Sequence, residues 1–68
     1  MDKNIGRTWQ SLRGLRTVHS FEADIGCYSV GTENHTFAML IEPARLERVI
    51  EADEADVWLR TQQEESHD

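Results

Sequence analysis

The sequence predicts a small α+β domain, in which an antiparallel sheet of two or three strands packs against a C-terminal helix or helix pair. Two apolar stretches with strand character are separated by a turn-rich stretch, and strong helix formers follow the single proline. The chain of 68 residues is long enough for one domain, which we place at 1–68 with loose termini at about 1–7 and 63–68.

The N-terminal third of the chain allows two interpretations. Thr8 could cap a short helical turn that contains Trp9, Leu12 and Leu15 at spacings of three. Gly14 disfavours a long helix at this place. Alternatively, residues 15–22 begin a strand, and a segment from about residue 18 to 23 adds a third strand to the sheet.

The middle of the chain predicts a β-hairpin. Residues 25–30 have strand character, with Tyr28 and Val30 on one face. Residues 36–41 form a nearly unbroken apolar strand that suits burial on both faces. The five residues between the two strands, 31–35, are rich in turn formers and predict the connecting loop.

The helical region begins at Pro43, because proline suits the first position of a helix. Its apolar residues fall on two stripes. One stripe contains Leu46, Ile50 and Val57, which lie within about 40° of one another around the helix axis at 100° per residue. The other, displaced by roughly 150–180°, contains Ala52, Ala55 and Leu59.

A single straight helix would have to bury both of these opposite stripes. A break near residues 51–53, with Asp53 as the N-cap of a second helix, would resolve this, so one helix and a helix pair both stay open. The helical residues expected to face the sheet are apolar: Leu46, Val49, Ile50 and Val57. Their expected partners on the last strand are Phe37, Met39 or Leu40, and Ile41.

The features that usually mark export or membrane insertion are missing from the sequence. Cys27 is the one cysteine, so an internal disulfide is excluded. The N-terminus has no apolar run typical of a signal peptide, and the longest apolar run, residues 37–41, is too short to span a bilayer. We predict a cytoplasmic protein without a membrane partner.

The sequence contains no convincing catalytic or metal-binding pattern. Cys27 with His19 or His35 is the one pairing of a nucleophile with a base, and we interpret Cys27 as a small core residue. The same three residues are spaced by eight, but zinc sites usually contain close ligand pairs, which are missing. The scattered glycines form no nucleotide-binding motif. We expect no enzyme activity, no cofactor and no metal.

Charge is distributed unevenly along the chain. The net charge is −6. Residues 1–41 contain four acids and four bases, whereas residues 42–68 contain nine acids and three bases. Nucleic-acid binders usually show the opposite sign, so we expect a basic partner and no direct contact with nucleic acid. The N-terminal bases could contact nucleic acid or an acidic partner, form solvated surface, or pair within the molecule with the acidic end; they are Lys3, Arg7, Arg13 and Arg16.

The acidic segment supplies the candidate binding residues. On a continuous helix, Glu47, Glu51 and Glu54 share one face. Trp58 lies beside them as an aromatic anchor. Asp53 and Asp56 flank the row. Carboxylates at helical spacing can imitate the phosphates of a nucleic acid, although a solvated face that keeps the protein soluble is the simpler interpretation.

In its small size and acidity, and in lacking a catalytic pattern, the chain resembles small phage-encoded inhibitors, including anti-CRISPR proteins and other DNA mimics. The resemblance implies an inhibitor that blocks a basic, nucleic-acid-binding surface of another protein. Two alternatives stay open. One is a homodimeric regulatory or accessory protein whose acids serve only solubility. The other is a ribbon-helix-helix-like DNA-binding dimer, in which residues 36–63 would provide the strand and two helices.

Overall fold

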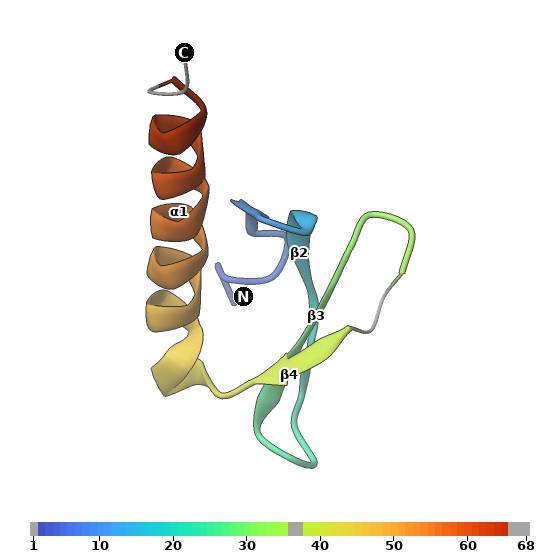
Figure 1. The fold of residues 1–68 in the computed structure, drawn as a ribbon. Helices are drawn as coiled ribbons and strands as arrows, with labels where there is room; N and C mark the ends of the chain where they lie inside the picture. The colour runs from blue at the N-terminus through green and yellow to red at the C-terminus, as the bar shows by residue number, and fades with distance from the viewer. Residues whose placement is uncertain (1, 36–37, 66–68) are drawn as a thin grey trace.

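The computed structural model describes residues 2–35 and 38–65 and shows an α+β fold, which confirms the predicted class (Figure 1). Within these residues the sheet has four strands rather than two or three, and they pair antiparallel in sequence order. One helix follows. The elements are β1 (Thr8–Ser11), β2 (Gly14–Glu22), β3 (Cys27–Gly31), β4 (Met39–Ile41) and α1 (Pro43–Glu65).

β1 replaces the short helical turn that was one interpretation of this region. Trp9 and Ser11 are buried while Thr8 and Gln10 are exposed, which is the two-residue alternation of a strand. A tight turn joins β1 to β2, since Ser11 pairs with Gly14. Gly14 has a φ of 114°, a conformation that glycine adopts without the steric penalty of a side chain. The turn chemistry therefore favours a hairpin over a helix.

β2 confirms the alternative interpretation, in which a strand covers this part of the chain. It pairs with β1 on one side and β3 on the other. The register shifts between Val18 and Ser20, which indicates a β-bulge at this place. Beyond the bulge, Phe21 pairs with Tyr28, and their rings meet edge to face with centroids 5.1 Å apart.

β3 and β4 form the predicted hairpin, but β4 is Met39–Ile41 where the prediction gave residues 36–41, and Gly31, predicted in the loop, belongs to β3. The expected burial of this strand on both faces is wrong, because Leu40 is 44% exposed. Tyr28 and Val30 share the buried face, as expected. β3 begins at Cys27 rather than Ile25, because residues 22–26 form a turn in which Gly26 donates to the Glu22 carbonyl at 2.8 Å. Residues 36 and 37, and with them the predicted packing of Phe37, lie outside the described residues.

α1 begins at Pro43 as predicted, and it is one continuous helix over the described residues. The alternative with a break at residues 51–53 and an N-cap at Asp53 is wrong. The two apolar stripes need no break, because only the first stripe is buried. The second stripe faces solvent: Ala52, Ala55 and Leu59 are all exposed.

The core lies between α1 and one face of the sheet, and all four strands contribute to it. Its buried apolar residues are Trp9, Val18, Tyr28, Val30, Ile41, Leu46 and Ile50. Leu46 and Ile50 belong to the same buried cluster as Ile41, and Val49 packs against it partly buried, but α1 lies mainly against β1 rather than against the predicted β4. Of the two alternatives on β4, Met39 packs against the core, whereas Leu40 is exposed on the opposite face of the sheet.

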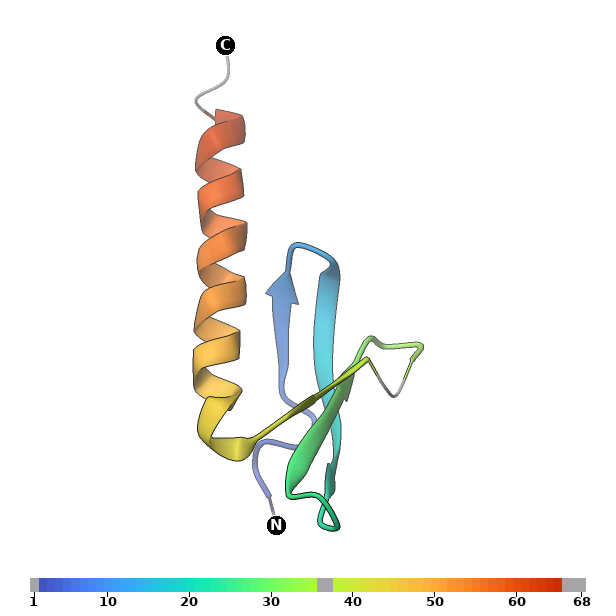
Figure 2. The same ribbon diagram turned by 60° about the horizontal axis from the view of Figure 1, so that its bottom comes forward.

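The C-terminal half of α1 projects beyond the sheet (Figure 2). A helix of 23 residues is about 35 Å long at 1.5 Å per residue, which exceeds the reach of the short strand β1 beside it. Trp58 and Leu59 on this half are 60% and 51% exposed. In the part of the chain that the structure describes, no helix combines the length and apolar character needed to cross a membrane.

Candidate functional site

The continuous helix brings four of the six predicted site residues together on one side. Glu47, Glu51 and Glu54, which we call the acidic row, are spaced by four and three residues and therefore lie one above another along α1. Trp58 continues the line one turn further on. All four side chains are exposed. The acidic row and Trp58 therefore form one exposed side of α1, as their spacing in the sequence predicts.

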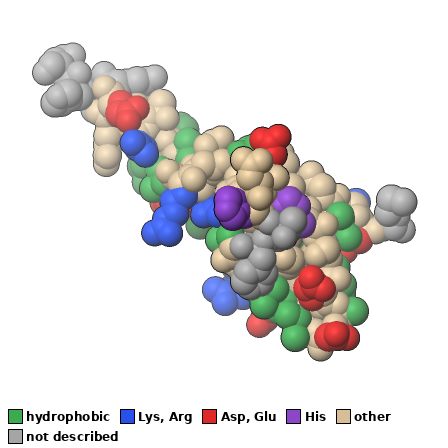
Figure 3. All heavy atoms as spheres, turned by 90° about the vertical axis from the view of Figure 1, so that its right-hand side faces the viewer, with side chains coloured by type: hydrophobic (Ala, Val, Ile, Leu, Met, Phe, Trp, Pro, Cys, Tyr) green, Lys and Arg blue, Asp and Glu red, His purple; other side chains and the backbone are tan. Residues whose placement is uncertain are grey.

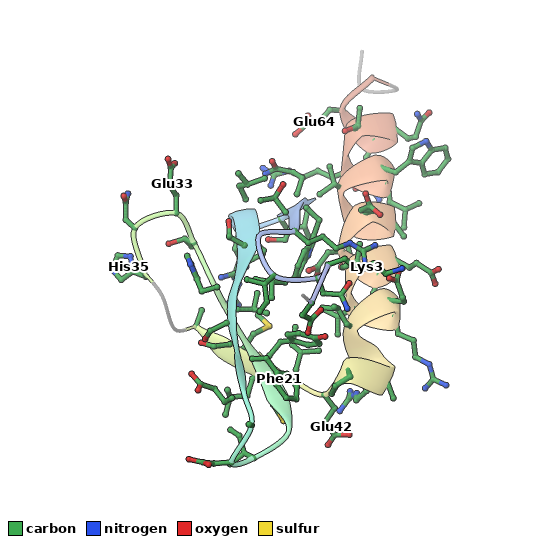
Figure 4. The ribbon with its side chains drawn as sticks, turned by 180° about the vertical axis from the view of Figure 1, so that it is seen from behind. Lys3, Phe21, Glu33, His35, Glu42 and Glu64 are labelled. Atoms are coloured by element: carbon green, nitrogen blue, oxygen red, sulfur yellow. The ribbon has the colours of Figure 1, made fainter. Side chains whose placement is uncertain are left out.

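The N-terminal segment occupies one end of the acidic row. The Tyr28 hydroxyl donates to Asp2 Oδ2 at 2.6 Å and accepts from Asn4 Nδ2 at 3.1 Å. The backbone then joins β2, because Gly6 donates to the Val18 carbonyl and Val18 donates to the Arg7 carbonyl. These bonds hold residues 2–7 against the sheet and direct Arg7 toward α1. Figure 4 shows Lys3 of the same segment beside the helix.

Arg7 and Glu47 form a two-pronged ion pair. Nη1 donates to Glu47 Oε1, and Nη2 donates to Oε2 at 3.2 Å. The hydrogen bonds from Arg7 lower the pKa of Glu47 against an opposing effect of desolvation, and the charge of Lys3 lowers it further. One of the N-terminal bases therefore pairs within the molecule, and Glu47 is the least available member of the acidic row.

The Arg7–Glu47 pair makes a testable pH prediction. Because the folded state lowers the pKa of Glu47, the pair stabilises the fold above the unfolded-state value of about 4.3, and this contribution is lost as pH falls. We expect the unfolding temperature of wild-type protein to exceed that of Glu47→Gln near pH 6, and the difference to disappear near pH 3. Glu51→Gln, which removes an exposed carboxylate without an ion pair among the described residues, is the matched control. A pH-independent difference would contradict the prediction.

Asp53 points toward the sheet rather than toward a partner. Its Oδ2 accepts a hydrogen bond of 2.7 Å from the indole nitrogen of Trp9, and the side chain is half-buried. This bond joins the middle of α1 to β1. Asp53 therefore contributes to the position of the helix on the sheet, a role that the sequence analysis missed.

Asp56 lies on the far side of the helix from the acidic row, about 160° around the axis from Glu54. Together with Asp53 it lines a cavity of about 260 Å³ beside the β1–β2 turn. Arg13 and Arg16 line the same cavity, and Arg16 Nε is buried without a hydrogen-bond partner among the described atoms. Asp56 thus shares a cavity with two cationic residues of its own chain and is separated from the row.

A groove lies on the other side of α1, where the helix leaves the sheet. It has a volume of about 310 Å³. Its lining residues are Gln10 from β1 and Glu54, Val57, Trp58 and Thr61 from α1. Gln10 and Thr61 were not identified from the sequence, because the contact between β1 and the helix depends on the tertiary fold. The groove adjoins the acidic row at Glu54 and contains the predicted anchor Trp58.

The three residues spaced by eight do not meet in one place. His19 Nε2 donates to the Thr32 carbonyl at 2.8 Å, and His35 Nδ1 lies 3.5 Å from Thr32 Oγ1. Figure 3 shows two histidines on the side of the sheet away from α1, where the carboxylates lie singly. Cys27 begins β3, at the opposite end from Thr32. The described residues include no group of three His, Cys, Asp or Glu side chains that could hold a metal ion.

No family model matches the chain, and no curated protein or solved structure matches it either. Function is therefore inferred from the chain's own residues, of which the exposed side of α1 offers the most specific arrangement.

Proposed function

We propose that the protein is a non-enzymatic interaction protein that binds a basic surface of another protein through the acidic row and Trp58. One observation supports this above others. Glu51, Glu54 and Trp58 are exposed on a helix that projects from the sheet, and no ion pair within the described residues involves either glutamate. Two neighbouring carboxylates without ion-pair partners attract an oppositely charged partner, and the aromatic ring beside them provides apolar surface that binding can bury.

The partner that fits best is a surface that itself binds nucleic acid. The carboxylates of the row follow one another at intervals of about 4.5–6 Å along the helix axis. The phosphates of one duplex strand follow one another more closely, at about 3.4 Å along the axis, so the row resembles them as a line of like charges and not in its exact spacing. A groove of Lys and Arg side chains shaped for phosphates can therefore accept the row. The proposal includes a phage-type inhibitor that acts as a DNA mimic, in the manner of anti-CRISPR proteins.

Charge reversal tests the proposed function. We expect tagged wild-type protein to retain a nucleic-acid-binding partner from lysate at low salt and to release it at high salt. The double variant Glu51→Lys/Glu54→Lys should retain none, whereas Glu33→Lys, on the β3–β4 loop, should behave like wild type (Figure 4). Far-ultraviolet circular dichroism checks that both variants are folded. Retention by the double variant, or retention that resists salt, would overturn the proposal.

A homodimeric regulatory or accessory protein is the second candidate. Trp58 and Leu59 are large apolar side chains left uncovered on the projecting half of α1, and a second copy could cover them. In that case the acids serve solubility, and charge reversal leaves function intact. Sedimentation over a range of concentrations separates the two candidates, because only this one requires a dimer.

The ribbon-helix-helix alternative requires one strand followed by two helices. In the described residues, β4 is instead an edge strand of a four-stranded sheet, and a single helix follows it. We therefore propose no DNA-binding dimer of that kind.

A further inference from the structure

The groove between β1 and α1 has a lining of mixed chemistry. Val57 is half-buried and Trp58 is 60% exposed, so the apolar part of the lining is accessible to a ligand. Glu54 is the one charged residue that lines it among the described residues. The volume of about 310 Å³ is at the small end of ligand pockets, which suits a single side chain rather than a large molecule.

The polar groups of the groove are mainly acceptors. Thr61 Oγ1 already donates its hydrogen to the Val57 carbonyl at 3.0 Å, which leaves its oxygen to accept. Gln10 Nε2 donates one hydrogen to the Ser11 carbonyl at 3.3 Å, which leaves its second N–H and its carbonyl oxygen for a ligand. The carboxylate of Glu54 accepts on both oxygens. A ligand that complements this set should carry several donors and a positive charge.

The charges around the groove favour a cation. Glu51 lies on the same side of the helix about two turns before Trp58, and one turn before Glu54, and adds a second exposed carboxylate. Arg60 pairs with Glu64 at 3.3 Å and lies on another side of the helix, so it does not neutralise the groove. The pKa of Arg7 is raised mainly by its hydrogen bonds to Glu47, and the charge of Glu54 adds only a smaller contribution.

We propose that this groove binds the side chain of an arginine on the basic partner, with the guanidinium over the Trp58 indole and paired with Glu54. The inference rests on the proposed function and names the residue type that the partner inserts. Arginine fits better than lysine, because its planar guanidinium stacks on an aromatic ring and offers five donors in a fixed fork. Its methylene stem can lie against Val57, since the stems of long cationic side chains cover apolar surface.

The first test is a nuclear magnetic resonance titration of the ¹⁵N-labelled full chain. The probe is an end-blocked glycine-spaced tri-arginine peptide. We expect the Trp58 indole signal and the Gln10 and Thr61 amides to shift, and the indole of Trp9, which is buried and bonded to Asp53, to stay in place. The same peptide with neutral citrulline should cause no shift. A lysine peptide should bind more weakly; equal binding by the lysine peptide would overturn the inference.

Matched variants assign the binding to the groove. Trp58→Ala and Glu54→Gln should each lower the affinity for the arginine peptide by about two- to fivefold, which corresponds to the loss of one exposed cation–π contact or ion pair. Leu59→Ala, about 100° around the helix from Trp58, and Glu33→Gln, on the β3–β4 loop, should leave the affinity unchanged. Equal weakening by a variant and its control would exclude the groove as the site.

The outcomes separate this inference from the proposed function. If the partner retained from lysate is lost with Glu51→Lys/Glu54→Lys but unaffected by Trp58→Ala, the acidic row binds and the arginine site is wrong. If neither the partner nor the peptide binds wild-type protein, both are wrong. Retention of the partner with selective loss in Trp58→Ala and Glu54→Gln supports both.

Discussion

Replacing Leu46 with alanine is expected to destabilise the protein by about 2–5 kcal/mol, the usual range for truncating a buried leucine. Leu46 is 2% exposed and belongs to the core between α1 and the sheet. A domain of this size is stable by only roughly 3–10 kcal/mol, at 0.05–0.15 kcal/mol per residue. The single substitution therefore removes a large share of the total stability.

Leu59→Ala is the matched control for this prediction. It removes the same atoms from the same helix, and any change in helix propensity is shared. Leu59 is 51% exposed, so we expect a loss within about 0.5 kcal/mol. Urea unfolding followed by circular dichroism measures both variants. Equal losses would show that the exposed side of α1 is covered in solution, and a dependence of the Leu59→Ala loss on protein concentration would identify a second copy as the cover.

Local patterns were sufficient to predict the β3–β4 hairpin and the start of α1. Both depend on signals within a few residues, namely the turn formers at 31–35 and the proline at position 43. β1 was ambiguous because four residues of alternation are too few to outweigh the helical spacing of Trp9, Leu12 and Leu15. The strand is favoured over the helical turn by the burial of Trp9 beneath α1, which is a tertiary contact.

Of the two alternatives for the C-terminal region, a single helix is present and the helix pair is wrong, for a different reason. The helix pair assumes that every apolar stripe of a helix must be buried, and so places a break where the stripes change. The small sheet covers only one side of α1, and Ala52, Ala55 and Leu59 stay exposed. A periodic pattern identifies which residues share a face, but it does not show how many faces the rest of the chain can cover.

The acidic row was predictable from helical spacing, whereas the partners of its neighbours were not. The Arg7–Glu47 and Trp9–Asp53 contacts join residues 40 and 44 positions apart. Contacts of that separation depend on the path of the whole chain, so no local signal could specify them. They divide the six predicted residues into an exposed group at Glu51, Glu54 and Trp58 and others with intramolecular neighbours.

The hydrogen bond between Trp9 and Asp53 makes the second prediction with a large effect. Asp53→Ala leaves the indole N–H of a buried tryptophan without its acceptor, which costs about 1–3 kcal/mol. Asp53→Asn keeps an acceptor oxygen and should cost less. Trp9→Phe removes the donor and part of the buried ring, so we expect a loss of about 2–4 kcal/mol from packing and the lost bond together.

A double-mutant cycle isolates the bond itself. If it forms in solution, the double variant Trp9→Phe/Asp53→Ala should be about 1 kcal/mol more stable than the sum of the single losses predicts, because the second substitution removes a bond already lost. Strict additivity in urea unfolding would show that the bond contributes nothing. The cycle also bears on binding. If a substitution at Asp53 weakens partner binding in proportion to its loss of stability, Asp53 acts by positioning α1. If Asp53→Asn keeps its stability but loses binding, the charge of Asp53 belongs to the interface.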